Sequence, residues 1–448
     1  MTDVAWIEAA ITAARPRAVA ALLRYFRDLD AAEEGFQEAC LRALRTWPRN
    51  GPPRDAAAWL ILVGRNAAID GVRRRSRQEP LPDEAALSDL EDAEEALAER
   101  LDGAHYRDDI LRLLFVCCHP DLPATQQIAL ALRIVCGLSV AQIARAFLVG
   151  EAAMEQRITR AKARIGQSQS RNGADASFAA PGAVERAERL AAVTAMVYLI
   201  FNEGYSGPAV AAAGDARSGL CDEAIRLGRL LLRLFQTEPE LMGLVALMLL
   251  QHARRNARFD ADGGVVLMEE QDRALWDGKM IAEGLALIDK AMRHRRAGPY
   301  QVQAAIAALH ARAARPQDTD WAQIDRLYAA LERMQPSPVI TLNRAVAVCK
   351  VQGAGAALAM IEPLEARLSG YFHYFGLKGA LLLELQRTDE AREAFGRAIA
   401  LAKTAAEAAH IRQRLDRLIA DSAAPPRAGQ GQDKQCGAIV GRGAPATS

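Results

Sequence analysis

Aromatic residues, cysteines and long apolar runs are scarce in this sequence of 448 residues, and each scarcity narrows the choice of fold. Only 5% of the residues are aromatic although 51% are hydrophobic, a balance that favours packed helices over sheets. No apolar run approaches the ~18 residues of a membrane span, and no N-terminal apolar segment of the signal-peptide kind occurs. The net charge of +1 supplies no global field for nucleic acids, so any basic site has to be local.

The seven cysteines are an odd number scattered through helix-like contexts, so we expect reduced, buried thiols in a cytoplasmic protein without a membrane anchor. Cys117, Cys118 and His119 are adjacent, and adjacent side chains cannot easily converge on one tetrahedral ion. The remaining histidines have no HExxH or triad-like neighbours. We therefore expect no metal, no cofactor and no catalytic site, and the protein is not expected to be an enzyme.

Changes in composition divide the chain into helical parts and connectors. Residues 79–102 hold ten acidic residues against one arginine and begin with two prolines, which predicts an acidic linker. Polar, glycine-containing stretches predict a second connector and a disordered tail. We expect an all-α protein in six parts: a helical bundle at 1–78, the acidic linker at 79–104, a helix-turn-helix region at 105–166, a connector at 167–182, a helical-repeat domain at 183–420 and a disordered tail at 421–448.

A basic helix is predicted at the end of the first part. Trp59, Leu60, Val63, Ala67 and Val72 recur at helical spacing and predict a buried face. Residues 59–78 also carry five arginines against one aspartate, a cluster that suits contacts to DNA phosphates. A solvated helix end is the alternative. The residues predicted to contact DNA here, with Asn66 as a reader of base edges, are Arg65, Asn66, Asp70, Arg73, Arg74, Arg75 and Arg77.

Residues 138–164 predict a helix-turn-helix. Ser139 is a suitable N-cap for a helix that reaches about residue 146, residues 147–150 supply a turn, and a second helix starts near Glu151. Apolar side chains would form the small core between the two helices: Ile143, Ala144, Leu148, Met154 and Ile158. The second helix is expected to contact DNA through Glu155, Gln156, Arg157, Arg160, Lys162 and Arg164.

A sequence repeat is visible towards the C-terminal end. Four pairs share one spacing, namely Ala345 with Gly379, Ala357 with Ala391, Ile361 with Phe395 and Leu364 with Ala398. This spacing equals the tetratricopeptide period of ~34 residues, in which small residues let paired helices approach and one aromatic residue fills the gap. A tetratricopeptide-like domain is therefore predicted, with a generic helical bundle as the alternative.

The first basic stretch and the helices before it resemble region 2 of extracytoplasmic-function sigma factors of bacterial RNA polymerase, and the helix-turn-helix resembles their region 4. The strings that carry the first resemblance are DAAEE (30–34), QE (37–38), CLRA (40–43), WL (59–60), RN (65–66), AID (68–70) and RR (73–74). Gly35 and Phe36 depart from the family pattern by replacing aliphatic residues, and Gly64 stands where Ala is common.

The rest of the chain is similar to the subgroup of these sigma factors with a C-terminal tetratricopeptide-like extension. The strings that carry this resemblance are LRLLF (111–115), CCHP (117–120), FNEGY (201–205), LCDEA (220–224), QDR (271–273), LWD (275–277), GPYQ (298–301) and LNRAV (342–346). The two resemblances together span nearly the whole chain and leave out only the acidic linker and the tail.

The resemblance implies a transcription initiation factor whose partners are core RNA polymerase, through its β′ clamp and β flap, and promoter DNA. Region 2, with the turn at 50–55, would read the −10 element and hold unpaired bases, while region 4 would read the −35 element as duplex. The polymerase-binding face would be Glu33, Glu34, Gln37, Glu38 and Arg42. The extension would support or regulate activity through a partner within the chain or another protein.

Two other functions remain open from the sequence alone. A tetratricopeptide scaffold without sigma activity would leave the arginines of 65–74 unexplained. A conventional helix-turn-helix regulator would bind DNA but would not support transcription by core polymerase.

Overall fold

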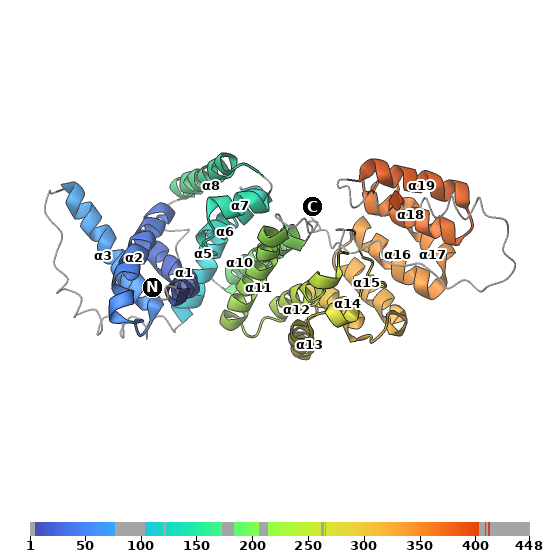
Figure 1. Cartoon of the computed structure of the whole chain (residues 1–448), viewed down its shortest axis with the longest axis horizontal. Helices are drawn as coiled ribbons and strands as arrows, with labels where there is room; N and C mark the ends of the chain where they lie inside the picture. Colours follow the sequence, from blue (N-terminus) through green and yellow to red (C-terminus); the bar gives the residue numbers. More distant parts are fainter. Residues whose placement is uncertain are drawn as a thin grey trace. The chain divides into compact units, whose positions relative to one another are not determined.

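A computed structural model describes residues 5–76, 104–119, 122–147, 149–172, 183–205, 214–260, 264, 266–402, 408 and 411–412, and within these ranges the chain is built of helices and their connections (Figure 1). The predicted all-α class is confirmed. Two compact units divide between Ile200 and Phe201. None of the described helices is long and apolar enough to cross a membrane.

The first unit holds both predicted DNA-binding regions. Its helices are α1 (Ala5–Phe26), α2 (Leu29–Asn50), α3 (Ala56–Ser76), α5 (Ala104–Cys117), α6 (Ala124–Ile134), α7 (Val140–Ala146), α8 (Glu151–Asn172) and most of α10 (Ala183–Tyr205).

Local signals in the sequence set the bounds of region 2, which comprises α1, α2 and α3. The Asp28 carboxylate accepts a hydrogen bond from the Ala31 amide at 2.7 Å and begins α2, which ends before Gly51 at φ 82°. Asp55 accepts bonds from the first amides of α3. Trp59 is half-buried and meets Trp47 edge-on at 5.3 Å, so it belongs to the core, as the sequence favoured.

Two glycines explain the departures of region 2 from the family pattern. A Cβ on Gly64 would lie 2.8 Å from the Gly35 carbonyl oxygen, and a Cβ on Gly35 would lie 3.1 Å from the Gly64 carbonyl oxygen. Helices α2 and α3 therefore cross at a point where neither backbone leaves room for a side chain. Glycine at both positions lets the two backbones approach this closely.

The helix-turn-helix of region 4 is confirmed at the predicted positions. Ser139 accepts a hydrogen bond from the Gln142 amide at 3.1 Å, and the Gln142 side chain accepts one from the Ser139 amide at 2.8 Å, which is a complete capping box. Helix α8 begins at Glu151. The predicted core residues Ile143, Ala144, Met154 and Ile158 are buried, whereas Leu148 lies outside the described residues.

The connector predicted at 167–182 is wrong in its first part, because α8 continues to Asn172. This stretch has no proline to end the helix, and Ser and Gln tolerate helical geometry. The division between the units falls within α10 and not at residue 183 as composition suggested. The acidic linker up to residue 103, residues 173–182 and the tail lie outside the described part of the chain.

The second unit holds the helices of the extension. They are α11 (Gly214–Leu234), α12 (Pro239–His252), α13 (Gly278–Arg293), α14 (Pro299–Arg312), α15 (Trp321–Met334), α16 (Pro338–Gln352), α17 (Ala354–Ile361), α18 (Phe372–Glu384) and α19 (Thr388–Leu401), with the short 3₁₀ helices η2 (Arg255–Ala257), η3 (Arg273–Leu275), η4 (Pro316–Asp318) and η5 (Glu362–Leu364). The apolar run at 241–250 forms most of α12 and is buried all round, with contacts to α11, α13 and α14.

The sequence repeat is confirmed in the last two helix pairs. Helix α16 begins at Pro338 and α18 at Phe372, while α17 begins at Ala354 and α19 at Thr388. Both offsets equal the spacing of the sequence repeat, so each pair of helices is one repeat unit. A Cβ on Gly379 would lie 2.6 Å from the ring of Phe395, so the small and the aromatic residue of the pattern pack on each other.

Thiols in the described residues are free at Cys40, Cys117, Cys118, Cys136 and Cys221. Burial raises the pKa of the Cys118 thiol to about 12.

The glycine crossing gives the first prediction. Gly64→Ala should lower the free energy of unfolding of the first unit by about 1–3 kcal/mol, because a methyl group is forced against the α2 backbone. Gly166→Ala is the matched control, since it also lies in a helix but a Cβ there meets nothing, and it should gain up to ~1 kcal/mol from helix propensity. Urea unfolding compares the two, and equal effects would contradict the close crossing.

Candidate nucleic-acid interface

The described part of the predicted −10 surface is a pair of exposed residues on α3. Arg65 and Asn66 are both exposed, and the Arg65 guanidinium lies 4.5 Å from the ring centre of Tyr25, which is 47% exposed. Asp70, Arg73, Arg74 and Arg75 lie on α3, but their side chains are outside the described set, as is Arg77 entirely. Tyr25 was not predicted from the sequence, because Arg65, the residue of α3 that its ring contacts, lies forty positions further along the chain.

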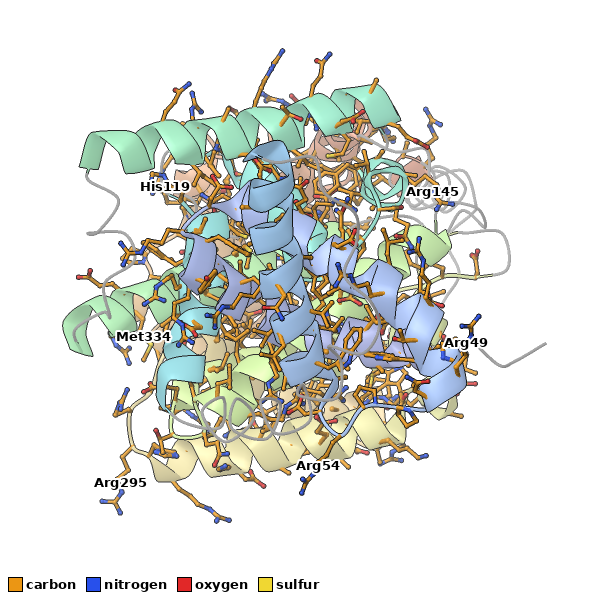
Figure 2. The ribbon with its side chains drawn as sticks, turned by 90° about the vertical axis from the view of Figure 1, so that its left-hand side faces the viewer. Arg49, Arg54, His119, Arg145, Arg295 and Met334 are labelled. Carbon is orange, nitrogen blue, oxygen red and sulfur yellow. The ribbon has the colours of Figure 1, made fainter. Side chains whose placement is uncertain are left out.

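The turn before α3 borders the same region. Arg49, at the end of α2, and Arg54, in the turn, are both exposed and both labelled in Figure 2. Arg17 of α1 lies 3.7 Å from the Asp55 carboxylate, which ties the turn to the first helix. The turn is thus fixed at Asp55 and carries a basic side chain at its surface.

Helix α8 separates a buried face from an exposed one. Met154, Ile158, Ala161 and Ile165 are buried at helical spacing. Of the residues predicted to contact DNA, Glu155, Gln156, Arg160 and Arg164 are exposed and Arg157 is half-buried. Arg145 ends α7 with an exposed side chain (Figure 2). The second helix therefore presents the basic face that a recognition helix needs.

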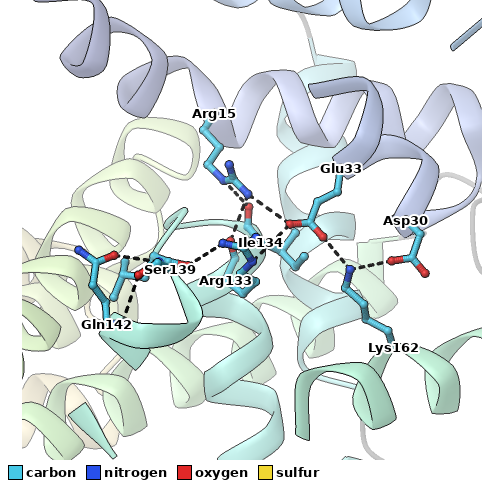
Figure 3. Close-up of polar contacts among 9 residues, drawn as sticks. Arg15, Asp30, Glu33, Arg133, Ile134, Ser139, Gln142 and Lys162 are labelled. Atoms are coloured by element: carbon cyan, nitrogen blue, oxygen red, sulfur yellow. Dashed lines mark hydrogen bonds and ion pairs between the residues drawn. The ribbon is translucent and has the colours of Figure 1, made fainter. Parts of the chain in front are cut away.

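Lys162 lies elsewhere, in a cluster that joins region 4 to region 2 (Figure 3). Its Nζ lies 2.6 Å from Glu33 Oε2 and 2.6 Å from Asp30 Oδ1, both on α2. Glu33 is only 5% exposed, so the residue that sequence assigned to polymerase and the residue assigned to DNA bind each other in this conformation. Neither is available to an outside partner while this ion pair persists.

Two arginines complete this cluster. Arg15 of α1 approaches Glu33 at 3.5 Å, and Arg133 of α6 approaches it at 3.8 Å. Arg15 also donates to the carbonyl oxygens of Ile134 at 2.9 Å and Arg133 at 3.2 Å, which the end of α6 leaves without helical partners. We call Arg15, Asp30, Glu33, Arg133 and Lys162 the inter-region cluster.

The chemistry of the cluster keeps its charges in place. Burial lowers the pKa of the Lys162 ammonium, but the hydrogen bonds to Asp30 and Glu33 outweigh it and raise the pKa above its usual value. Gly137, at φ 78°, allows Arg15 to pass, because a Cβ there would lie 2.8 Å from the Arg15 side chain. Because its pKa is raised, Lys162 stays charged well beyond neutral pH.

A second ionic contact joins the same two regions. Asp109 of α5 is 3% exposed, and its carboxylate lies 2.9 Å from Arg112 and 3.0 Å from Arg24 of α1. Helices α1 and α5 pack together at this point. Buried carboxylates thus face cations of the other region at two separate places.

The predicted polymerase-binding face divides on α2. Glu34 and Gln37 are exposed, and Glu38 pairs with Arg42 at 3.5 Å near the surface, whereas Glu33 turns inward. Two further residues on the same face were not predicted from the sequence. Leu41 is 51% exposed and Leu44 is 46% exposed. Their helical spacing from Gln37 was the signal available in the sequence.

A metal site does not form in the described part of the chain. Among those residues there is no group of three His, Cys, Asp or Glu side chains able to hold an ion.

Comparisons with known proteins bear on both regions and on the extension. The chain matches the family described as Sigma-70 region 2 over residues 10–78 and Sigma-70, region 4 over 112–165. Residues 189–292 match a "Family of unknown function (DUF6596)". The "Uncharacterized protein R00370" of Rhizobium meliloti (strain 1021) is 69% identical over 423 residues, which are 94% of this chain and 98% of the relative. No solved structure matches significantly.

The inter-region cluster gives the second prediction. Glu33→Gln should lower the stability of the first unit by about 3 kcal/mol, because three cations lose their buried counter-charge. Glu38→Gln is the control: its ion pair with Arg42 is near the surface, so its loss should change stability by less than ~0.5 kcal/mol. Hydrogen exchange of α1, α2, α6 and α8 measures both, and equal effects would show that the cluster is not stabilising.

Proposed function

Since the chain belongs to the sigma-70 factors of the extracytoplasmic-function type that carry a C-terminal extension, and these recognise promoters, we propose that it binds core RNA polymerase with α2 and reads the −10 and −35 elements with α3 and α8. The observation that carries the proposal is the confirmed helix-turn-helix, whose second helix exposes arginines, in one unit with a second basic helix.

The polymerase surface is proposed to be the outer face of α2. Leu41 and Leu44 are large apolar side chains that lie exposed among Glu34, Gln37 and Arg45. An apolar centre with a polar rim is the usual anatomy of a protein interface. The face suits the helical β′ clamp, with Glu38 and Arg42 at its edge and Glu33 beneath it.

The −10 surface is proposed to be Tyr25, Arg65 and Asn66 together with the basic end of α3. An exposed aromatic ring beside a guanidinium is a platform on which an unpaired base can stack, and Asn66 is placed to bind a base edge. Asp70, Arg73, Arg74, Arg75 and Arg77 would follow the strand, the arginines by neutralising phosphates. The fixed turn at 50–55 would border the bases.

The −35 surface is proposed to be the exposed face of α8. Glu155 and Gln156 would face base edges in the major groove, while Arg157, Arg160 and Arg164 would contact the phosphates that line it. The capping box of α7 fixes the angle between the two helices and so the approach of α8 to the duplex. Lys162 is removed from this set in the packed conformation.

Promoter geometry requires the two regions to separate. The −10 and −35 elements differ by about 25 base pairs, or ~85 Å of B-DNA. Lys162 and Glu33 are 2.6 Å apart, so regions held together by the inter-region cluster cannot lie on both elements at once. Polymerase and promoter would therefore open the cluster. The packed conformation would be that of the free chain, before either of them binds.

The extension is proposed to support this activity. It is a separate compact unit, and stacked helix pairs in general can form a concave surface that binds a peptide or helix. The family without a known function lies mostly within it. Its partner would be another part of this chain or a second protein.

Transcription itself tests the proposal. The chain with core polymerase should yield transcripts from a library of genomic fragments, and Leu41→Glu should reduce them about tenfold or more by placing a charge in the apolar centre of the α2 face. Met292→Glu, at an exposed residue of the second unit, is the control and should transcribe normally. If the unaltered chain yields no transcripts, the proposed sigma function is contradicted. If Leu41→Glu keeps full activity, polymerase does not bind at the apolar centre of the α2 face.

Duplex recognition has its own test on a fragment found in this way. Arg157→Ala with Arg160→Ala should weaken binding and lower the slope of log affinity against log salt by up to ~1.8, about 0.9 for each phosphate that is no longer neutralised. Arg392→Ala, an exposed arginine of α19, should change neither. Anisotropy titrations at several salt concentrations measure the slope, and an unchanged slope would show that α8 does not lie on DNA.

A further inference from the structure

A basic surface lies at the end of α13 in the second unit, and the proposed sigma activity makes no use of it. Lys290, Arg293, Arg295 and Arg296 follow one another closely in the sequence, and all four side chains are exposed. The Arg295 side chain points outward from the end of its helix (Figure 2). We call Lys290, Arg293 and Arg295 the α13 basic surface.

These three cations have no counter-charge of their own. Arg296 forms an ion pair with Glu238 at 3.3 Å and is therefore left out of the surface. Lys290, Arg293 and Arg295 form no ion pair or side-chain hydrogen bond with the rest of the described chain. Their charged groups are thus available to a partner from outside.

The carboxylates around the surface do not balance its charge. Glu238 is matched by Arg296, and Asp289, which precedes Lys290, is matched by Arg312 at 3.1 Å. Glu240 is mostly buried and accepts two hydrogen bonds at the start of α14. Of these three carboxylates only Glu240 lacks a cation of its own, so a surplus of positive charge remains.

The helix dipole accounts for part of the surface. Lys290 and Arg293 lie in the last turn of α13, where the partial negative charge of the helix end favours cations. These two residues alone could therefore serve the stability of the helix, and Arg295 has to be considered separately.

Arg295 lies beyond the helix in a backbone conformation that favours glycine. Its φ is 51°, and its amide donates to the Met292 carbonyl oxygen at 3.1 Å. Glycine would make the same hydrogen bond without strain, so the sequence keeps a charged side chain at a backbone cost. Strain of this kind is typical of residues that bind a partner.

The composition of the surface points to phosphates. Met292 is 65% exposed but lies ~200° around the helix from Lys290, so the cations do not surround it. Protein interfaces have an apolar centre within a polar rim, which this surface lacks. A DNA backbone requires positive charge and little else, and guanidinium groups donate paired hydrogen bonds to phosphate oxygens.

We propose that Lys290, Arg293 and Arg295 bind the phosphate backbone of duplex DNA without reading its sequence. The extension thereby contributes its own contact to DNA, in addition to those proposed for α3 and α8. This contact needs neither a promoter nor polymerase, so it stands or falls independently of the sigma function.

The test uses the full chain and a duplex without promoter sequence, followed by anisotropy at several salt concentrations. The triple variant Lys290→Gln, Arg293→Gln, Arg295→Gln should bind more weakly and lower the slope of log affinity against log salt by up to ~2.7, about 0.9 for each phosphate. A matched control removes the same charge from three exposed arginines elsewhere in the second unit and should leave the slope nearly unchanged. Its changes are Arg326→Gln, Arg333→Gln and Arg367→Gln.

A single variant separates binding from folding. Arg295→Gly should unfold at the same or a higher urea concentration, because glycine relieves the left-handed backbone, and should still lower the salt slope by ~0.9. A lower unfolding midpoint with an unchanged slope would show that Arg295 is structural and overturn the proposal. An unchanged slope in the triple variant, or an equal loss in the control, would also overturn it. If the triple variant binds core polymerase more weakly but DNA equally well, the surface binds protein and the proposal is wrong.

Discussion

A buried carboxylate, that of Glu33, holds the two DNA-binding regions together. Burial of a charge is unfavourable unless other charges and hydrogen bonds compensate it. Here Arg15 compensates from region 2, while Lys162 and Arg133 come from region 4. Arg15 in turn satisfies the last carbonyl groups of α6. Separation of the regions breaks the ion pairs of Glu33 with Lys162 and Arg133 and the hydrogen bonds of Arg15 to α6 at once, so binding to polymerase and promoter DNA has to outweigh them.

Local signals made much of the fold predictable from the sequence. The capping box of Ser139 and Gln142 is formed by near neighbours in the chain, so the bounds of the helix-turn-helix could be read directly, and the spacing of the sequence repeat set the last helix pairs. The pairing of Lys162 with Glu33 could not be read, since 129 positions separate them. Lys162 was assigned to DNA because its neighbours on α8 are arginines, a property that says nothing of where each side chain points.

The polar strings of the extension also acquire a physical reason. Their polar residues stand in apolar surroundings along the chain, where buried polar groups need partners. In the described residues Arg258 lies 3.6 Å from the Tyr205 ring centre, Arg254 donates to the Tyr205 hydroxyl and stacks near Trp276, and Arg273 follows on Trp276. Alternating guanidinium groups and aromatic rings thus connect FNEGY to QDR and LWD. The pattern depends on tertiary packing, so periodicity could not reveal it.

The distance between the two regions tests their proposed separation most directly. Dyes placed at Ala9 on α1 and Thr125 on α6, both exposed, would report it by resonance energy transfer. We expect efficient transfer in the free chain and a large loss of transfer when core polymerase and promoter DNA are added, because the regions move apart towards elements ~85 Å from each other. Transfer that stays high in complexes that are making transcripts would contradict the opening of the inter-region cluster.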